Sequence, residues 1–552
     1  MQVELTFPSG ERRRYDRGIR TADLIQDSEL RKEANRIVAA KLNNEVVSLS
    51  YRITVNGALQ PVYLDDPDGN ELYRKTLCFL LGMAARELFP DRRLVISHSL
   101  SDGYYYYFDG ADEASDVDLG RIEKRIRELV ESNAPIHQHV VSYTDAVSYF
   151  EENNRPDTAL LLRYQSHAKV PVYQCGDYMD LSHGPLLSRT GWLTTFEIVP
   201  YAPGFLLRFP RDPSKTLLPA FEPNAVLFSI YQEYNSWGKI LDMNCVGLLN
   251  QHIHDGNIQE FIQVAEALHD KKIASISDRI CEKRDTVRLV LVAGPSSSGK
   301  TTFTKKLAIQ LRVHGRNPIA VSLDDYFLPR DSSPLDENGA PDLEALEAIN
   351  VALLNDHLLR LFEYNEVEMP RYDFITGRPR PKGVKLRLPG RAILILEGIH
   401  GLNDKLTAQI PREQKFKIYV SALTQLNLDN HNRVRTTDNR LIRRIVRDHK
   451  YRGHSALDTL EMWPSVHRGE NRYIFPFQNS ADAAFNSALD YELAVLKIYA
   501  EPLLRTIKPD VSEYSEARRL LLFLYNFLPI QPHLVPSQSI LREFIGESEF
   551  DY

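Results

Sequence analysis

Cysteine is scarce in this chain of 552 residues, which contains four cysteines, six methionines and three tryptophans. The cysteines stand far apart, at Cys78, Cys175, Cys245 and Cys281. The sequence contains no C-x-x-C pair and no Cys/His cluster, which argues against a zinc site with tetrahedral ligands. Four separate thiols are typical of a protein from a reducing compartment, where they stay unpaired.

Long apolar runs are also missing from the sequence. The most apolar stretches lie around residues 289–293, 393–396 and 520–530, and each is much shorter than the roughly 20 residues that span a bilayer. The N-terminus reaches the basic residues 12–14 without an apolar segment, which argues against a signal peptide. We therefore expect a soluble, cytoplasmic protein with no membrane partner.

The residues that are present form an ordinary globular mixture, 43% hydrophobic and 26% charged, with a net charge of −7. This composition excludes disorder or fibrous structure for most of the chain. The negative net charge excludes the uniformly basic surface of a nucleic-acid coat, although it is compatible with a local basic patch. At about 150 residues per domain, the length predicts roughly three or four domains.

Changes in the sequence pattern divide the chain into five parts. Residues 1–65 alternate between polar and apolar like a small β-rich module, and a polar, turn-rich stretch follows them. Residues 66–211 mix helical and strand patterns, and residues 212–283 indicate a mostly helical connector. Over residues 284–510 strands and helices alternate, which predicts an α/β domain with a mainly parallel sheet. Residues 511–552 suggest no function.

The clearest motif is a phosphate-binding loop. Residues 294–301 read G-P-S-S-S-G-K-T and fit G-x-x-x-x-G-K-[ST] in full, between an apolar strand pattern and a helical one. In such a loop, backbone N–H groups and a helix N-terminus bind phosphate oxygens. Lys300 can reach the β- and γ-phosphates, and the Thr301 hydroxyl can ligate Mg²⁺. A chance Gly/Ser turn is the alternative, and the flanking elements argue against it. The predicted nucleotide-binding residues are Gly294, Ser296, Ser297, Ser298, Gly299, Lys300, Thr301 and Thr302.

Carboxylates follow two further predicted strands. Asp324 and Asp325 come after the apolar residues 319–323, and Glu397 comes after residues 392–396. Catalytic groups of open α/β sheets gather at the carboxyl ends of the strands. Asp324 is therefore a candidate base for a substrate hydroxyl, and Glu397 a second candidate ligand for Mg²⁺. A turn or helix-capping role for Asp324 and a solvated strand end for Glu397 are the alternatives.

A dense basic run occupies residues 433–452, where eight basic residues stand beside only two acidic ones, Asp438 and Asp448. Arg440, Arg444 and Arg447 are spaced to share one helix face. Such a row repels itself unless an anion faces it. We favour a lid that closes over a triphosphate and neutralises charge in the transition state. Binding of RNA phosphates and a merely solvated face are the alternatives.

These motifs, taken in order, resemble the uridine kinase/phosphoribulokinase family of P-loop kinases. The resemblance runs from about residue 287 to residue 498 and rests on residues 294–302, 322–327, 370–374, 396–399, 443–448 and 452–453. It implies ATP and Mg²⁺ as cofactors, with Mg²⁺ held by Thr301 and Glu397. The implied catalytic residues are Asp324 (as the base), Lys300, Arg444 and Arg447. Arg452 is implied in ATP binding, and Asp324, Tyr326, Asp342, Tyr372 and Arg444 in substrate binding.

The resemblance breaks at the positions that would read the base of a nucleoside. Uridine–cytidine kinases carry a histidine five residues after the tyrosine that matches Tyr372, and this sequence has Gly377 there. Their lid glutamine falls at Met462, beside Trp463. Phosphorylation chemistry is therefore expected, whereas the identity of the acceptor base is left open.

The N-terminal half resembles a different family, the threonyl-tRNA synthetases. Residues 1–65 look like their TGS domain, a ubiquitin-like β-grasp module, and residues 66–211 look like their α+β editing module. The motifs are L-F-P at residues 88–90, S-D-G-Y-Y-Y at 101–106 and D-L-S-H-G-P at 180–185. The editing fold uses H-x-x-x-H and C-x-x-x-H pairs. Here those four positions carry Arg74, Cys78, Ser182 and Leu186, so editing chemistry is not expected.

Two functions follow from these resemblances. The first is an ATP/Mg²⁺-dependent nucleoside kinase that transfers the γ-phosphoryl group to the 5′-hydroxyl of a nucleoside. The alternative is a nucleotide-switched, RNA- or tRNA-binding regulatory protein that uses its synthetase-like half. A hydrolase that removes misattached amino acids is a third reading, and it lacks the expected ligand residues.

Overall fold

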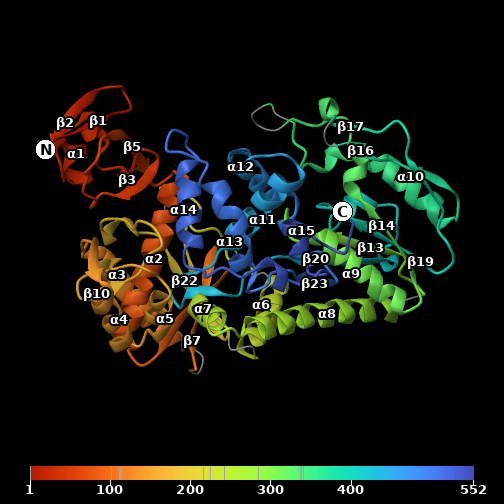
Figure 1. Cartoon of the computed structure of the whole chain (residues 1–552), viewed down its shortest axis with the longest axis horizontal. Coiled ribbons are helices and arrows are strands. Elements are labelled where there is room, and N and C mark those ends of the chain that lie inside the picture. The colour runs from red at the N-terminus through yellow and green to blue at the C-terminus, as the bar shows by residue number, and fades with distance from the viewer. Residues whose placement is uncertain are drawn as a thin grey trace.

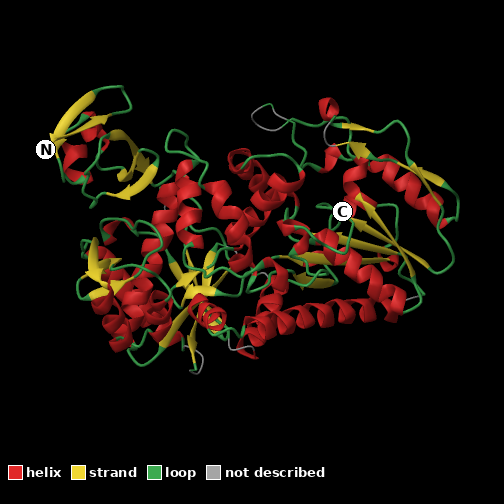
Figure 2. Ribbon diagram, viewed as in Figure 1, coloured by secondary structure: helices red, strands yellow, loops and turns green. Residues whose placement is uncertain are grey.

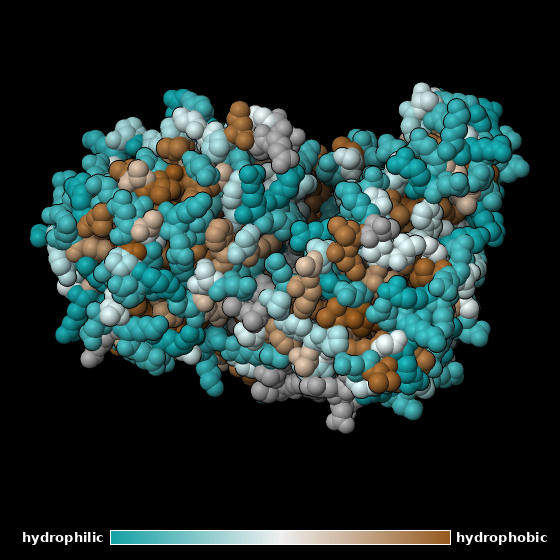
Figure 3. All heavy atoms as spheres, turned by 180° about the vertical axis from the view of Figure 1, so that it is seen from behind, coloured by the Kyte–Doolittle hydropathy of each residue, from teal (hydrophilic) through white to brown (hydrophobic). Residues whose placement is uncertain are grey.

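The computed structural model describes residues 2–100, 102–110, 115–215, 217–223, 225–240, 243–283, 285–335, 339, 341–373 and 376–551. Figure 1 shows an elongated molecule with the N-terminal strands at one end and a second sheet near the other end, where the C-terminus also lies. Within the ranges given, no helix combines the length and the apolar character needed to cross a bilayer. Seen from behind, polar side chains cover most of the surface, and apolar ones form small separate groups (Figure 3).

The N-terminal segment forms a five-stranded sheet beside a short helix (Figure 2). The strand order is β2-β1-β5-β3-β4, and only the β1–β5 pair is parallel. The alternation expected from the sequence is present, since Val3, Leu5 and Phe7 are all buried in the core of this unit. Its elements are β1 (Gln2–Thr6), β2 (Arg12–Asp16), α1 (Thr21–Gln26), β3 (Ile37–Leu42), β4 (Glu45–Ser48) and β5 (Gly57–Tyr63).

The next segment combines two antiparallel sheets with four helices. Its long helix α2 (Pro67–Leu88) buries an apolar face that includes Leu77, Leu80 and Leu81 in the core of this unit. The sheets have the strand orders β11-β12-β7-β6 and β10-β9-β8. The remaining elements are β6 (Arg93–Leu100), β7 (Gly103–Asp109), α3 (Asp116–Glu131), β8 (His137–Ser142), α4 (Tyr143–Glu152), α5 (Pro156–Arg163), β9 (Lys169–Cys175), β10 (Tyr178–Asp180), β11 (Glu197–Tyr201) and β12 (Gly204–Arg208).

Three helices lead from this segment to the second half of the molecule: α6 (Ala225–Ile240), α7 (Val246–His254) and α8 (Ile258–Glu282). Helix α8 runs along the lower edge of the molecule in Figure 1 and packs against α9 (Lys300–Val313). It buries Phe261, Ile262 and Ile273 in the largest hydrophobic core of the protein.

The second half is built on a parallel five-stranded sheet, as the sequence predicts. The strand order is β14-β19-β13-β20-β23, and every neighbouring pair is parallel. The valine-rich strand β13 lies in the middle and is completely buried, with Val290 and Val292 in one core and Leu289 and Leu291 in another. The strands are β13 (Leu289–Ala293), β14 (Asn317–Ser322), β19 (Ala392–Glu397), β20 (Lys415–Ser421) and β23 (Ala483–Asn486).

Further elements surround this sheet. Helix α10 (Val351–Phe362) belongs to one of the two cores, and α11 (Thr436–Tyr451), α12 (Ala456–Tyr473) and α13 (Glu492–Leu504) belong to the other. Three two-stranded ribbons pair β15 (Val367–Met369) with β18 (Val384–Leu386), β16 (Tyr372–Asp373) with β17 (Arg378–Pro379), and β21 (Asn427–Asp429) with β22 (Asn432–Arg433).

The C-terminal segment, for which the sequence suggested no function, is part of the largest core. Its helices are α14 (Tyr514–Leu524) and α15 (Arg542–Ile545). Leu520, Leu524, Leu541 and Phe544 are all fully buried, and α15 packs against α11. The chain thus returns to the sheet after α13 and ends beside the phosphate-binding loop.

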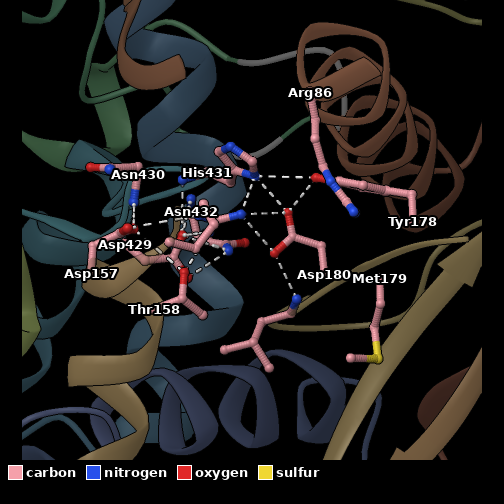
Figure 4. A network of polar contacts seen from close by, with 12 residues as sticks. Arg86, Asp157, Thr158, Tyr178, Met179, Asp180, Asp429, Asn430, His431 and Asn432 are labelled. Carbon is pink, nitrogen blue, oxygen red and sulfur yellow. Dashed lines mark hydrogen bonds and ion pairs between the residues drawn. The ribbon is translucent and has the colours of Figure 1, made fainter. Parts of the chain in front are cut away.

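The ribbon β21–β22 ties the two halves of the molecule together. The Asn427 side chain donates a 2.6 Å hydrogen bond to the Ile96 carbonyl oxygen, and the Ile96 amide donates to Asn430 at 2.7 Å. Figure 4 shows the buried polar network beyond it, in which His431 lies 2.6 Å from Asp180. Although burial alone would raise the pKa of Asp180, Arg155 and His431 hold it below its ordinary value.

Candidate functional site

The loop between β13 and α9 needs glycine at two positions. Gly299 has a φ of +77°, and a Cβ placed there would lie 2.5 Å from Cγ2 of Ile540. A Cβ on Gly294 would lie 2.0 Å from the carbonyl oxygen of Val420 on the neighbouring strand. Close packing on both sides therefore holds the loop against the N-terminal end of α9.

Two serines of this loop present polar groups without partners. Ser297 and Ser298 are buried, and their hydroxyl groups have no hydrogen-bond partner among the described residues. A buried hydroxyl of this kind costs free energy unless a ligand or a water satisfies it. Both groups lie at the positive end of α9, so they fit the oxygens of a bound phosphate.

Lys300 is the first residue of α9, and its side chain folds back over the loop. Its Nζ donates a 3.0 Å hydrogen bond to the Pro295 carbonyl oxygen. Burial lowers the pKa of Lys300, and the nearby carboxylates of Glu397 and Asp324 oppose that change. The ammonium group is therefore placed between the loop and the two carboxylates.

Thr301 and Glu397 meet at the carboxyl ends of β13 and β19. The Thr301 hydroxyl donates a 3.0 Å hydrogen bond to Oε1 of Glu397. Burial raises the pKa of Glu397 to about 7, although Lys300 acts in the opposite direction. A hydroxyl and a carboxylate are oxygen donors that suit Mg²⁺, which takes its other ligands from phosphate and water. Among the described residues, no group of three or more His, Cys, Asp or Glu side chains is arranged to hold a metal.

Asp324 follows β14 in a single 3-10 turn, with its side chain half-buried. Burial raises the pKa of Asp324, and Lys300 and Arg452 lie close enough to oppose the rise. The next residue is turned another way, because Asp325 forms a 2.7 Å ion pair with Arg371 and accepts a hydrogen bond from the Tyr372 amide. Of the two neighbouring aspartates, Asp324 is the one whose charge counteracts the lowering of the Lys300 pKa.

Sequence reasoning missed a further carboxylate at this site, Glu344. Burial raises the pKa of Glu344 to about 7, with Glu470 adding to the rise and Arg444 and Lys300 opposing it. Gly469 on α12 leaves room for this side chain, since a Cβ there would lie 2.5 Å from Cβ of Glu344. Glu344 belongs to no recognisable motif and reaches the site only through long-range packing.

We expect the raised pKa of Glu344 to make the protein less stable as the pH rises. The folded state binds this proton more tightly than the unfolded state, in which a glutamate titrates near pH 4.5. The stabilisation is therefore present below about pH 4.5 and is lost as the pH rises to about 7. Urea unfolding at pH 5 and pH 8 should show this decline, and Glu344→Gln should reduce it by about 2 kcal/mol. The exposed neighbour Glu347 provides the control variant Glu347→Gln, and an equal decline in all three proteins would contradict the assignment.

Three arginines of α11 contact the loop directly. Arg440 Nε donates to the Ser296 carbonyl oxygen at 2.9 Å, and Arg443 donates to the Ser297 carbonyl oxygen at 3.2 Å. Arg444 donates to the Ser296 hydroxyl at 3.0 Å. Arg440 and Arg443 are among the most deeply buried side chains of the protein. The basic helix thus supports the backbone of the phosphate-binding loop.

The arginine row is neutralised by carboxylates of the same chain. The ion pairs are Arg440 with Glu470, Arg443 with Glu492, and Arg444, Arg447 and Arg452 with Asp448. The inference that this row requires an external anion is therefore wrong. Asp448, inside the run, compensates three of these arginines, and the acids for Arg440 and Arg443 come from α12 and α13.

A carboxylate from the C-terminal segment lies at the N-terminus of α9. Glu543 Oε2 accepts hydrogen bonds from the Thr302 amide at 3.1 Å and from the Thr302 hydroxyl at 2.8 Å. An anion at a helix N-terminus is stabilised by the helix dipole and the free N–H groups. Thr302 was predicted to bind nucleotide, and in this structure both of its polar groups bind Glu543 instead.

The structure does not bring every predicted residue to this site. The prediction that Tyr326 contacts substrate is wrong. Its ring is buried in the core, where its hydroxyl lies 3.1 Å from Nδ1 of His357. Tyr372 lies on β16 with its ring against Phe327. Asp342 accepts a 3.1 Å hydrogen bond from the Tyr473 hydroxyl at the end of α12. Phe374 of the predicted P-R-Y-D-F motif falls outside the described residues.

Comparison with known proteins assigns the two halves to different relatives. Residues 289–494 match the model of the Phosphoribulokinase / Uridine kinase family. The N-terminal part is similar to the threonine–tRNA ligase of Ruegeria sp. (strain TM1040), with 32% identity over 192 residues, or 34% of this chain and 30% of the ligase. The ligase of Syntrophotalea carbinolica is 32% identical over 206 residues, or 37% of this chain and 32% of the ligase. The matched stretch thus spans less than a third of the length of these relatives.

Two solved structures share segments with the chain. A structure described as a "Possible Uridine Kinase" from Bacillus stearothermophilus is 19% identical with a TM-score of 0.23, and the match covers 38% of this chain and 98% of that one. D-glycerate 3-kinase from Cryptococcus neoformans is 15% identical with a TM-score of 0.23, covering 46% and 87%. The family match and the ligase relatives confirm the two resemblances that the sequence motifs indicated.

Proposed function

We propose that residues 284–510, which contain the match to the Phosphoribulokinase / Uridine kinase family, form a kinase that phosphorylates a small hydroxyl acceptor with ATP and Mg²⁺. We take the 5′-hydroxyl of a nucleoside as the acceptor. The observation that carries the proposal is the placement of Lys300 between the phosphate-binding loop and the carboxylates of Asp324 and Glu397. These groups stand at the carboxyl ends of neighbouring parallel strands, where α/β enzymes bind their ligands.

Each residue of the site has a role that its surroundings support. The loop amides, the Ser297 and Ser298 hydroxyls and Lys300 bind the phosphates of ATP. Asp324, next to Lys300 and free of the ion pair that holds Asp325, accepts the proton of the acceptor hydroxyl. Mg²⁺, held by Thr301 and Glu397, neutralises phosphate charge when bound.

The arginines at the end of α11 complete this assignment. Arg444 and Arg447 share Asp448 and face solvent more than Arg440 and Arg443 do. A change of partner from Asp448 to a phosphate oxygen would keep both guanidinium groups paired. Arg452, which ends the helix with a half-exposed side chain, contributes to ATP binding in the same way.

We infer that the acceptor binds near Asp324, with Tyr372 and Asp342 as candidate contacts. Arg371 and the Tyr372 amide both bind Asp325, which fixes the segment that carries Tyr372 next to the proposed base. Asp342 is oriented by Tyr473 and offers a carboxylate to sugar hydroxyls. Gly377 stands where the related kinases have a base-reading histidine, so the proposal fixes the phosphorylated hydroxyl and not the base.

For the N-terminal half we propose a TGS-like β-grasp unit at residues 1–65 and an editing-like unit at residues 66–211. The strand order β2-β1-β5-β3-β4 and the threonine–tRNA ligase relatives support this division. The positions of the editing ligands hold Arg74, Cys78, Ser182 and Leu186, so this half should not deacylate tRNA. Residues 212–283 are the connector, and residues 511–552 pack against the kinase unit.

The experiment that tests the proposed function is an ADP-release screen of the full chain with ATP and Mg²⁺. The acceptors are ribonucleosides, deoxynucleosides and sugar phosphates, with ATP alone as the background. Acceptor-dependent ADP release with a ribonucleoside, and its loss with the matching 5′-deoxy compound, would support the proposal. Salt-sensitive tRNA binding together with no acceptor-dependent ADP release would overturn it in favour of an RNA-binding regulator.

The contact between Glu543 and Thr302 leads to a prediction about nucleotide affinity. Glu543 places a negative charge where the proposed site holds phosphate, so Glu543→Gln should tighten ATP binding by roughly tenfold, which is about 1.4 kcal/mol. Calorimetric titration of both proteins with ATP measures the difference. Glu547, an exposed acid of the same segment that pairs with Arg542, provides the control variant Glu547→Gln. Unchanged or weaker binding by Glu543→Gln would show that this carboxylate does not compete with phosphate.

A further inference from the structure

A cavity lies between the two halves of the molecule, and no residue of the phosphate-binding loop lines it. It has a volume of about 100 Å³ and is partly open to solvent. Helix α2 and the segment after β10 supply one wall, and the ribbon β21–β22, α11 and α14 supply the other. Asp180 and His431 of the network in Figure 4 stand at its edge.

Four cationic side chains line this cavity, and three of them have carboxylate partners. Lys75 and Arg435 both pair with Glu71, each at 2.7 Å. Arg519 forms two 2.7 Å contacts with Asp438. Arg433 is different, since its guanidinium forms no ion pair with any described residue.

The surroundings of Arg433 make its positive charge costly. The side chain is half-buried, and its Nε is buried without a hydrogen-bond partner among the described residues. Its guanidinium lies 4.7 Å from the centre of the Tyr104 ring, which offsets part of the cost. Burial lowers the pKa of Arg433, yet a guanidinium stays charged near neutral pH. The charge of Asp438 acts on Arg433, but Asp438 is already paired with Arg519, so a buried Arg433 with no ion pair of its own would be stabilised by a further anion.

Besides the four cations, the cavity is lined by apolar or uncharged side chains and by two carboxylates that already have cationic partners, Asp180 with Arg155 and Asp438 with Arg519. Apolar side chains from both halves form its walls, and burial holds the pKa of the adjacent His183 at about 4, so that its imidazole is uncharged at neutral pH. Nε2 of His183 is buried without a partner among the described residues. The apolar lining residues are Phe79, Ile96, Leu186, Leu428 and Phe523.

We propose that this cavity binds a small organic carboxylate, with the carboxylate on Arg433 and an apolar body against the aromatic and aliphatic walls. One unpaired guanidinium matches a single negative charge, whereas a phosphate monoester would bring about −1.5 to −2 and leave excess charge buried. A cavity of about 100 Å³ accommodates a ligand of about four carbon atoms. The site is composite, because Arg433 comes from β22 of the second half and Phe79 from α2 of the first.

This site is distinct from the proposed kinase centre and from the chemistry of the synthetase-like fold. Cys78, Ser182 and Leu186 line it, but none of them is the ligand residue that the editing fold uses at that position. Its only unpaired cation among the described residues belongs to the kinase half. The carboxylate site therefore exists only where the two halves meet.

The test uses the full chain without nucleotide and compares butanoate with butanamide, its neutral isostere. Ligand-observed NMR titration should show butanoate binding at least about tenfold more tightly than butanamide, because only the anion forms a charge-assisted pair with Arg433. Arg433→Gln should weaken butanoate binding by about tenfold or more and leave butanamide unchanged. Arg433→Lys should restore part of the affinity, because it keeps the charge and loses the two-pronged contact.

The control variant is Arg121→Gln, which removes an exposed arginine on α3 and should bind butanoate as the parent protein does. Thermal unfolding of each variant shows whether it is folded. If Arg433→Gln does not fold, Arg433→Lys still tests the proposal. Equal affinity for butanoate and butanamide, or butanoate binding that persists in a folded Arg433→Gln protein, would overturn the proposal. Because no nucleotide is present, neither result depends on the outcome of the ADP-release screen.

Discussion

Replacing Lys300 with alanine should reduce the rate of ADP release by about 10²-fold or more. Its ammonium group is the cation between the loop and the carboxylates of Asp324 and Glu397. Removing it takes away the charge that would stabilise the transferring phosphoryl group. It also leaves the two acids facing each other, which should weaken the binding of a polyanion such as ATP.

The control for this variant comes from the same helix. Lys305→Ala removes a lysine further along α9, whose Nζ contacts the backbone oxygen of Asp551. Its rate should stay within about twofold of the parent, as is usual for a site away from the reacting groups. Steady-state ADP release at saturating acceptor measures both variants. A Lys300→Ala protein that keeps its rate within threefold would contradict the assigned role of the loop.

The loop and the parallel sheet could be predicted because their signals are local. The G-x-x-x-x-G-K-T string and the apolar strand before it stand within thirteen consecutive residues, and the requirement for glycine at 294 and 299 is a matter of backbone geometry. Buried parallel strands also appear as unbroken apolar runs, as β13 and β19 do. In both cases the information lies within one segment of the chain.

The electrostatic partners of the site could not be read in the same way. Arg440, in the predicted phosphate-facing row, and Arg443 beside it pair with Glu470 and Glu492, which lie 30 and 49 positions away. Glu543 lies 241 positions from Thr302 and still provides its hydrogen-bond partner. Such contacts depend on how α12, α13 and α15 pack, and no periodicity or motif encodes that packing.

For Tyr326, the sequence predicted a contact with substrate that the structure does not show. The S-L-D-D-Y-F segment places it two positions after Asp324, which made it a candidate for binding substrate. The single 3-10 turn that follows β14 instead points its ring into the core, where its hydroxyl finds His357. With about three residues per turn, a 3-10 helix points side chains two positions apart in different directions, so closeness to Asp324 in the sequence does not imply a shared face.

Helix α11 connects the N-terminal half of the chain to the phosphate-binding loop. Arg433 and Arg435 stand at the junction between the ribbon β21–β22 and α11, and Arg435 pairs with Glu71 on α2 of the N-terminal half. The same helix carries Arg440 and Arg443 to the phosphate-binding loop. The N-terminal half is therefore joined to the loop by one continuous helix.

Replacing Asp324 with asparagine should abolish most of the acceptor-dependent turnover while leaving ATP binding nearly intact. We expect a loss of about 10²- to 10⁴-fold, the range for removal of a general base. Asparagine has nearly the same shape and cannot accept the proton of the acceptor hydroxyl. ATP binding should change by less than about threefold, because the phosphates are held by the loop and Lys300. A large loss of turnover with little change in ATP affinity is the result that identifies Asp324 as the base.

A matched variant and the pH profile sharpen this last test. Asp331→Asn removes an exposed aspartate that pairs with Arg378, and its turnover should equal that of the parent protein. Because burial raises the pKa of Asp324, the parent's turnover should increase with pH as this carboxyl loses its proton. In Asp324→Asn, turnover should be low and should no longer increase with pH in this way. If Asp324→Asn kept the parent's turnover, or lost ATP binding and turnover to the same extent, Asp324 would not be the base. Glu344, a further carboxylate of the site with a raised pKa, would then be the next residue to test.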